Sequence, residues 1–522
     1  MVSFSYQDST FQALLLATTM ANPLHACLLL VLLFLVLAYF HPGGVAWALS
    51  SGCHGAAAIP GPPGVLLAFA GPNPHRTLAG LAASRGATRL MAFSVGVTRF
   101  VVASHPDTAR EILAGAAFAD RPVKEAAAEL MFRRAMGFAP HGEYWRRLRR
   151  LASAHAFSPR RLAGRALAER RRAIGEETVR LVAFAMARDG VVGVRRPLHL
   201  ASLDNVMASV FGVSLGKLGE GAVSELEEMV KEGYELLGTF NWGDHLPLLR
   251  LLDVHGVRRR SRELASRVRL FVTKIIEEHR RRDEKNGGGG GCDDDGDFVD
   301  VLLGLEGEER LEEEDMVAVL WEMIFRGTDT VAILLEWVLA RMALHPDVQS
   351  KAQAEIDAAA AAADGDAAGL RYLHCVIKEC LRMHPPGPLL SWARLATRDT
   401  HLDSGRALVP AGTTAVVNMW AIARDSGLWR DAGEFRPERF LDDGDVSLAG
   451  CDLRLAPFGA GRRACPGRAL AMATVHLWLA QLLRSFRWVP SGAGVDMSER
   501  LNMSLEMEKP LLCLALPRTS SS

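Results

Sequence analysis

One cysteine near the end of the chain lies in a setting that favours its ionised form. Residues 458–467 read Phe-Gly-Ala-Gly-Arg-Arg-Ala-Cys-Pro-Gly, so Cys465 follows a glycine-rich turn. The glycines allow backbone angles that a side chain would forbid, which lets the chain wrap closely around a bound group. Pro466 suits the first position of the helix that the following alanine-rich run predicts, because its missing N–H would be unpaired there. At this positive end of a helix dipole, a thiolate is favoured over a thiol.

Two side chains of the same stretch could tune the sulfur. Phe458 can shield it from water, and Arg463 can carry positive charge toward an anionic ligand. For an isolated cysteine, the ordinary interpretation is a buried free thiol in a glycine-rich turn. Three further groups of residues upstream weigh against that interpretation.

The first group is an acid beside an alcohol within a long apolar run. Residues 316–344 predict a helix, and Asp329 and Thr330 lie near its middle although both are weak helix formers. Gly327 precedes Thr330 by three positions, so the threonine can bond back to the main chain and bend the helix. The sequence therefore predicts a groove beside this pair.

The second and third groups combine charge with helical spacing. Trp145 and Arg149 lie four apart on one face of a predicted helix, where an indole N–H and a guanidinium suit a carboxylate. The alternative is a basic surface helix with a packed tryptophan. Glu379 and Arg382 lie one turn apart on another predicted helix, and Arg439 follows in a turn. The alternative is two surface charge pairs, against which the occurrence of these residues in order with the cysteine loop argues.

Composition limits the classes of function. The 522 residues contain 60 basic and 60 acidic side chains, so the net charge indicates no nucleic-acid partner. The 8 cysteines include no Cys-x-x-Cys pair, which excludes the common zinc and dithiol motifs. Residues 287–291 are glycines and predict a flexible connection between helices. Residues 389–393 predict a short strand, followed by Arg394.

The N-terminal region predicts membrane attachment. Residues 11–40 are almost uncharged, and the first basic residue is Arg76. We favour an uncleaved anchor over a cleaved signal peptide, with the main domain in the cytosol. The proline-rich residues 60–64 end this region. The predicted organisation is an anchor over 1–50, a hinge over 51–66 and one large domain over 67–522.

The cysteine loop resembles the haem-binding loop of the cytochrome P-450 monooxygenases, matching it at Phe458, Gly461, Arg463, Cys465 and Gly467. The other motifs follow in family order, and the anchor and hinge extend the resemblance across nearly the whole chain. The resemblance implies a mainly helical fold with a small β-rich region and haem b between two central helices. Residues 241–245 and 325–331 resemble a plant microsomal subfamily that includes regulators of organ size, seed size and leaf-initiation rate.

The resemblance also implies roles for the motif residues. Cys465 would be the axial ligand of the haem iron. Asp329 and Thr330 would deliver protons during oxygen activation. The haem propionates would be bound by Trp145 and Arg149, with Arg394 a candidate for the second propionate. Glu379, Arg382 and Arg439 would form a buried charge network, and deleting one member should then cost roughly 3–5 kcal/mol.

The implied reaction is insertion of one atom of dioxygen into a C–H bond of a small apolar, fatty-acid-like substrate. Electrons would come from NADPH through a membrane-bound reductase, because the chain has no flavin or Rossmann fingerprint. The implied location is the endoplasmic reticulum membrane, in contact with lipid. An enzyme that rearranges or dehydrates an oxygenated lipid is the alternative, and a haem-binding regulator without turnover is a third interpretation.

Two positions depart from the family pattern. Arg326 stands where a small residue is expected, and Val331 replaces a second hydroxyl. Arg326 could pair with Glu322, four residues earlier on the helix. The sharper hypothesis is that Arg326 binds the carboxylate of a fatty-acid substrate.

Overall fold

The computed structural model describes residues 23–49, 59–64, 68–285, 296–361, 369–390, 393–442 and 446–518. Parts of the sequence predictions lie outside these ranges. They are residues 1–22 and 50 of the predicted anchor, 51–58 and 65–66 of the predicted hinge, and the glycine run 287–291.

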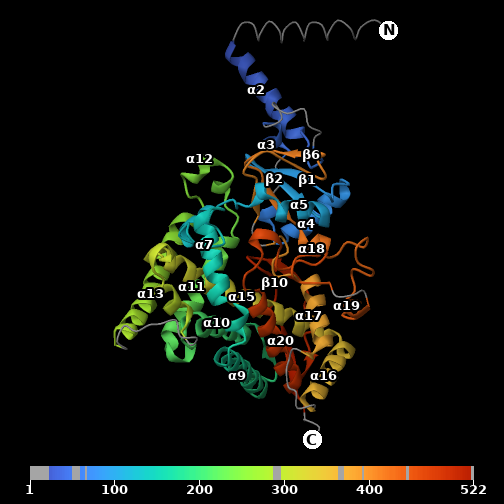
Figure 1. The fold of residues 1–522 in the computed structure, drawn as a ribbon. Coiled ribbons are helices and arrows are strands. Elements are labelled where there is room, and N and C mark those ends of the chain that lie inside the picture. The colour runs from blue at the N-terminus through green and yellow to red at the C-terminus, as the bar shows by residue number, and fades with distance from the viewer. Residues whose placement is uncertain are drawn as a thin grey trace.

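Helices make up most of the molecule, and one of them runs through its centre (Figure 1). Helix α15 (Glu313–Leu344) is buried along nearly its whole length, in agreement with the predicted apolar helix. The helices that pack around it include α10 (Arg195–Phe211), α13 (Val257–Lys285), α17 (Arg371–Met383) and α20 (Arg468–Ser485). A helix that is apolar on all sides can only be stable when it is covered in this way.

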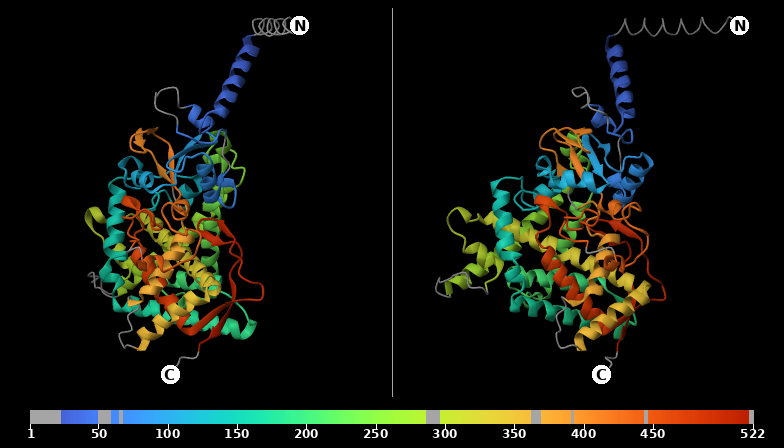
Figure 2. Two further views of the ribbon diagram at one scale, coloured as in Figure 1. Left: turned by 90° about the vertical axis from the view of Figure 1, so that its right-hand side faces the viewer. Right: turned by 45° about the vertical axis from the view of Figure 1, so that its right-hand side comes forward.

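The small β-rich region lies at the end of the molecule near α3 and α4 (Figures 1 and 2). Its main sheet has the order β1-β2-β7-β4, with β2 parallel to β7 and the other pairs antiparallel. Trp47 of α3 donates its indole N–H to the carbonyls of Phe93 and Phe100 at 3.1 and 3.2 Å, which fixes α3 on the β1–β2 hairpin. The sheet matters for the site because β4 begins with Arg394.

The bounds of the remaining helices and of the strands are as follows. The helices are α2 (Pro23–Phe40), α3 (Val45–Ala48), α4 (Pro74–Ser84), α5 (Pro106–Ala114), α6 (Glu125–Leu130), α7 (Glu143–Leu151), α8 (Pro159–Leu162), α9 (Arg165–Asp189), α11 (Glu220–Gly238), α12 (Pro247–Arg250), α14 (Phe298–Leu303), α16 (Pro346–Ala361), α18 (Met419–Ile422) and α19 (Arg439–Asp442). The strands are β1 (Met91–Val95), β2 (Thr98–Ala103), β3 (Val192–Gly193), β4 (Arg394–Leu395), β5 (Thr400–Leu402), β6 (Ala407–Val409), β7 (Thr414–Val417), β8 (Phe486–Pro490), β9 (Glu499–Leu501), β10 (Leu505–Met507) and β11 (Leu512–Pro517).

Two local predictions differ from the structure. Helix α20 begins at Arg468 with Gly467 as its N-cap, so Pro466 lies two residues before the first helical position. The predicted strand 389–393 is wrong for its described residues, because Leu389 and Leu390 form a turn and Leu390 has a φ of 52°. A left-handed residue of this kind cannot continue a strand.

Helix α2 projects away from the rest of the molecule (Figures 1 and 2). Several of its leucines are exposed, among them Leu28 at 57% and Leu30 at 66%. Across the ranges described above, no helix is both long enough and apolar enough to cross a lipid bilayer.

Glu379, Arg382 and Arg439 meet in the core, and their side chains are fully buried. Arg382 donates two hydrogen bonds to the Glu379 carboxylate at 2.8 Å, and Arg439 donates one at 3.1 Å. The main-chain N–H of Arg436 donates to the same carboxylate at 2.9 Å. The remaining guanidinium hydrogens reach the main-chain carbonyls of residues 423–434, so the network ties α17 to the segment before α19.

We expect Glu379→Gln to lower the free energy of unfolding by about 3–5 kcal/mol, because it leaves two buried guanidiniums without their anion. Urea unfolding of the full-length protein measures this change. Arg165→Gln is the control, because it removes an ion pair to Glu169 that lies on the surface. A loss for Glu379→Gln no larger than that of the control would contradict a stabilising role for the network.

Candidate active site

The loop before α20 holds Cys465 by main-chain contacts. The N–H of Cys465 donates to the carbonyl of Phe458 at 2.9 Å, which closes the loop on itself. Gly461 has a φ of 67°, and a Cβ there would lie 2.2 Å from the carbonyl oxygen of Leu113. No other residue fits this position, because both the backbone angle and the space exclude a side chain. The loop is thereby pressed against the end of α5.

The Cys465 residue has solvent-accessible surface, yet enough protein surrounds its thiol for burial to affect the thiol pKa. The thiol therefore borders a space inside the protein. Burial raises the pKa of the thiol, while the charge of Arg326, the N–H of Gly467 and the charge of Arg149 lower it. The sequence predicts that the helix start favours the thiolate, and the influence of the Gly467 N–H has that direction. Burial is the largest of these influences, so the net pKa of the thiol lies above its ordinary value, and the nearby cations and the N–H of Gly467 oppose that shift only in part.

Arg463 points away from solvent and bonds only to main-chain oxygens. Its guanidinium donates to the carbonyls of Ala119, Met136 and Ala139 at 3.0, 3.2 and 2.7 Å. It lies 4.5 Å from the ring of Trp145, whose indole N–H also donates to Met136, at 3.1 Å. The structure thus commits the Trp145 N–H to the backbone, whereas the sequence predicted that it would face a carboxylate.

The space near Cys465 has an excess of buried positive charge. Burial lowers the pKa of Arg394 to about 9, and the charge of Arg463 lowers it further. Burial lowers the pKa of Arg463 to about 10; the charges of Asp120 and Glu322 oppose this shift, and those of Arg149 and Arg326 add to it. Burial also lowers the pKa of Arg121 well below its usual value, with Arg394, Arg326 and Arg463 as the next causes. Within the described ranges, neither Arg149 nor Arg394 forms an ion pair. Buried cations require anions, so this space fits a ligand with negative charges.

Two acids face these arginines, Asp120 and, from α15, Glu322. Glu322 makes the contacts that join the segments. It accepts hydrogen bonds from the N–H of Gly137 at 2.8 Å and from Arg326 at 3.1 Å. A Cβ on Gly137 would lie 2.3 Å from the Glu322 carboxylate and 2.3 Å from the Arg326 guanidinium. The Glu322–Arg326 pair is therefore the ion pair that the helical spacing predicts. Residues 136–139 connect α15, through Glu322, with Arg463 of the cysteine loop.

Asp329 and Thr330 face different surroundings. Asp329 is buried, and its carboxylate lies 3.5 Å from Nε2 of His199 on α10. Burial raises the pKa of Asp329, while the charge of His199 and a hydrogen bond from Ser504 lower it. Thr330 is half-buried. The bond back to the main chain that was predicted for Thr330 is made by Thr328, whose hydroxyl donates to Ile324 at 2.7 Å.

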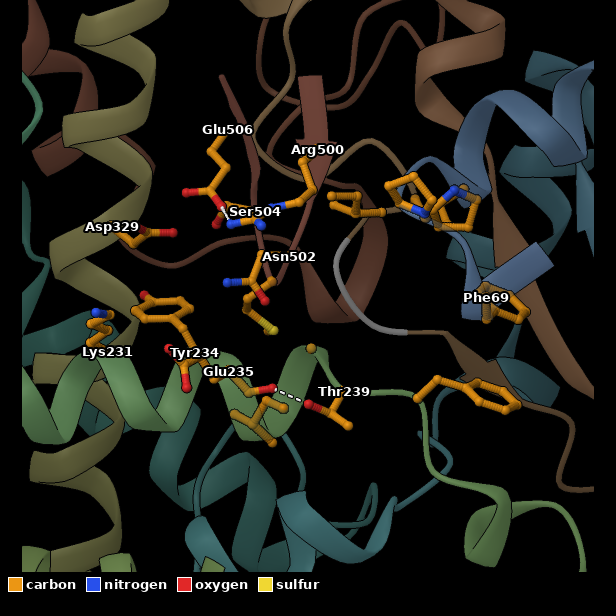
Figure 3. A pocket seen from close by; sticks show the side chains of 18 of the residues that line it. Phe69, Lys231, Tyr234, Glu235, Thr239, Asp329, Arg500, Asn502, Ser504 and Glu506 are labelled. Carbon is orange, nitrogen blue, oxygen red and sulfur yellow. Dashed lines mark hydrogen bonds and ion pairs between the residues drawn. The ribbon is translucent and has the colours of Figure 1, made fainter. Parts of the chain in front are cut away.

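A cavity of about 1630 Å³ adjoins this part of α15. Figure 3 shows Asp329, Tyr234 of α11 and Ser504 projecting into it from three sides. Its apolar lining comes from the β-rich region and the segment after α11, and includes Phe69, Phe100, Phe240, Leu389 and Val416. The lining of this cavity does not include Cys465, Thr330 or Arg326. The cavity therefore lies on the Asp329 side of α15 and not at the cysteine loop.

The chain and its fold are similar to those of known proteins. Residues 64–514 match the family model for cytochrome P450. Cytochrome P450 78A5 of Arabidopsis thaliana is 53% identical over 91% of this chain and 92% of the relative. Cytochrome P450 78A1 of Zea mays is 50% identical over 92% of this chain and 90% of the relative.

The fold also matches a zebra fish cytochrome P450 whose structure was solved with progesterone. The TM-score is 0.71 at 24% identity, over 85% of this chain and 99% of the other. The chain belongs to the cytochrome P450 family of haem monooxygenases and, within it, to the plant 78A type. The cysteine sulfur and the surplus of buried guanidiniums fit haem, which offers an iron atom and two carboxylates.

Sequence reasoning missed several residues of this site. His199 and Ser504 approach Asp329 from α10 and from the segment before β10, and neither belongs to a motif. Arg121 lies among the arginines, and Gly137 binds Glu322. No spacing signal could have found them, because each comes from a different part of the chain and acts through a tertiary contact.

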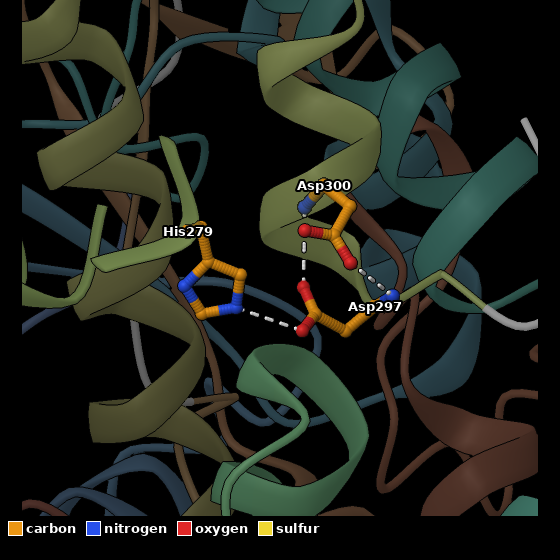
Figure 4. A group of neighbouring side chains, drawn as sticks. All are labelled: His279, Asp297 and Asp300. Atoms are coloured by element: carbon orange, nitrogen blue, oxygen red, sulfur yellow. Dashed lines mark hydrogen bonds and ion pairs between the residues drawn. The ribbon is translucent and has the colours of Figure 1, made fainter. Parts of the chain in front are cut away.

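A second cluster of titratable groups lies away from the cavity (Figure 4). Nε2 of His279 lies 2.8 Å from the Asp297 carboxylate, and Nδ1 lies 2.8 Å from the carbonyl of Ile275. Asp297 and Asp300 cap the first turn of α14 by accepting main-chain N–H bonds. Since both carboxylates and both ring nitrogens have partners, we interpret the cluster as a charged helix cap rather than a metal site.

This cap predicts a pH dependence. Burial lowers the pKa of His279, but the bonds to Asp297 and Ile275 outweigh it, and the net pKa lies above 6.5. The stabilisation is therefore complete below pH 6.5 and is lost as the pH rises through the folded-state pKa. We expect the difference in free energy of unfolding between the wild type and His279→Gln to shrink over that range. A difference that grows with pH would contradict a charged imidazole.

Proposed function

We propose that this protein inserts one atom of dioxygen into a C–H bond of a small apolar, fatty-acid-like substrate, with electrons from NADPH supplied by a reductase. The observation that carries the proposal is the position of Cys465 at a space with surplus positive charge. On the neighbouring helix α15, the buried Asp329 borders a large cavity. By its similarity to the plant subfamily, we extend the proposal to a role in organ or seed growth.

The proposed cofactor is haem b, with Cys465 as the ligand of its iron. When bound, haem supplies the one-electron and oxygen chemistry of the reaction. Arg149 and Arg394 are suited to the propionates, because burial lowers the pKa of each and neither has a carboxylate partner among the described residues. Trp145 would hold Arg149 and Arg463 in place, since both guanidiniums lie near its ring, at 5.9 and 4.5 Å.

The proposed proton carriers are Asp329 and Thr330. His199 supports this role for Asp329, because the imidazole is partly exposed at 30% and lies 3.5 Å from a carboxylate that is 10% exposed. A proton can therefore pass from water beside His199 to a buried acid whose pKa burial has raised. The apolar cavity wall excludes water from the substrate and holds its chain.

We also propose that the protein lies on the endoplasmic reticulum membrane, with the N-terminal segment as its anchor and the catalytic domain in the cytosol. In support, α12 lies at the same end of the molecule as α2 (Figure 1). Helix α12 and the residues after it carry strongly exposed apolar side chains: Leu248, Leu251, Leu252 and Val254 are 66–81% exposed. Exposed apolar patches of this kind favour a lipid surface. The exposed arginines of α7 could receive an acidic reductase.

The experiment that tests the proposed function uses membranes with the full chain, a plant reductase, NADPH and labelled dioxygen, with a panel of free fatty acids. We expect label in a hydroxylated product, loss of all product in Cys465→Ala and less product in Thr330→Ala. The carbon-monoxide difference spectrum of the reduced wild type shows whether thiolate-ligated haem is intact. Intact haem without labelled product from any acid would contradict the proposed substrate class.

We expect His199→Leu to lower the product formed per NADPH and to raise peroxide release, because protons then reach Asp329 more slowly. Without the imidazole charge the pKa of Asp329 rises further, so the acidic limb of the pH profile should move to higher pH. His401→Leu is the control, since His401 is exposed on β5. Unchanged coupling and an unchanged pH profile in His199→Leu would contradict the relay.

A further inference from the structure

The cations that line the large cavity differ in whether they are paired. Four arginines of the lining form ion pairs with carboxylates: Arg195, Arg196, Arg260 and Arg500. His199 lies beside Asp329. In the part of the chain that the structure describes, the lining cations without an ion pair are Lys124 and Lys231.

The two lysines have different surroundings. Lys231 is exposed on α11, where water can solvate its charge. Lys124 is the N-cap residue of α6, lines the cavity and is half-buried, and burial lowers the pKa of its ammonium. A desolvated ammonium gains far more from a direct anionic partner than a solvated one does. Lys124 is therefore the lining cation that most requires a ligand.

The groups that face Lys124 do not supply such a partner. The charge of Asp244 partly offsets the effect of burial on Lys124, but no hydrogen bond or ion pair joins the two side chains. One Asp244 oxygen instead accepts the N–H of Glu125 at 2.8 Å. Burial lowers the pKa of the neighbouring His245 to about 4, and the Lys124 charge contributes, so this ring is neutral at physiological pH.

The cavity joins this cationic position to the reaction side. Its lining includes both Lys124 and Asp329, together with the aromatic and aliphatic wall named above. A ligand that satisfies both features has an anionic head and a long apolar chain. Arg326, the candidate carboxylate partner from the sequence, is paired with Glu322 and is not in the lining.

We propose that Lys124 binds the carboxylate head of an amphiphilic substrate, whose chain lies along the apolar wall toward Asp329. This inference rests on the proposed function and assigns its substrate an acidic head at a defined position. The carboxylate replaces the direct partner that Asp244 does not provide. The head is then held at one end of the cavity, so the chain rather than the carboxyl carbon approaches α15.

Equilibrium dialysis of the full-length, haem-loaded protein tests this site without turnover. The probes are labelled hexadecanoic acid, its methyl ester and hexadecan-1-ol. We expect the wild type to bind the acid about tenfold more tightly than the ester, as for a charge-assisted hydrogen bond. Lys124→Met should remove this preference by weakening the acid alone, and Lys124→Arg should keep it. Lys231→Met is the matched control and should also keep it.

Asp244→Asn supplies a second test, because it removes the negative charge nearest to the proposed head. We expect it to strengthen acid binding and to leave the ester unchanged. The alternative is that Lys124 serves only as a distant partner of Asp244. In that case Asp244→Asn would leave acid binding unchanged, and Lys124→Met would weaken the binding of all three probes equally. Either of these results, or a wild type that binds acid and ester equally, would overturn the proposal.

The two proposals fail in different ways. A preserved preference for the acid, without labelled product from the reconstituted system, would contradict the proposed reaction and leave the Lys124 site standing. Labelled product with no preference for the acid would contradict the Lys124 site and leave the reaction standing.

Discussion

Buried positive charge is the constraint on which the rest of this structure depends. Arg463 and Arg394 lie inside the protein, and burial holds the pKa of each well below its usual value. A cation in such a place is costly unless dipoles or anions surround it. The chain meets part of this cost with the main-chain carbonyls that bind Arg463 and with Glu322. The remainder fits a cofactor that carries carboxylates.

The same constraint explains how distant segments are joined. Residues 136–139 offer two carbonyls to Arg463 and one N–H to Glu322, so the segment connects the cysteine loop to α15. Gly137 must lack a side chain, because a Cβ would collide with the Glu322–Arg326 pair. On α17, the fully buried carboxylate of Glu379 binds both Arg382 and Arg439, whose side chains are also fully buried. Charge pairing therefore contributes, together with apolar packing, to the position of these segments.

The two sides of α15 have different chemistry. Toward the cysteine loop the neighbours of α15 are arginines, which suit an anionic, flat prosthetic group. Toward the cavity they are Asp329, His199 and Ser504, which suit proton movement, and beyond them lies an apolar wall. In our proposals, the first side holds the cofactor, and the second supplies protons and places an acidic lipid whose head is bound by Lys124.

The sequence by itself determined the class of protein and the elements that carry the motifs. The apolar run of α15, the Trp145–Arg149 spacing on α7 and the glycine-rich loop at Cys465 depend on local backbone preferences, which a sequence displays directly. It also indicated the Glu322–Arg326 pair, since residues four apart on a helix are neighbours. It placed the start of α20 two residues early and assigned a strand to 389–393, because turns depend on tertiary contacts.

Only the tertiary structure decided which groups face one another. His199 meets Asp329 across two packed helices, and Gly137 meets Glu322 although 185 positions separate them. The indole N–H of Trp145 binds Met136 rather than facing a carboxylate, because folding brings that carbonyl within 3.1 Å. Whether Lys124 lies in water or in a cavity is likewise a property of the folded chain. Burial and partner choice arise from packing between distant segments, and no local pattern encodes them.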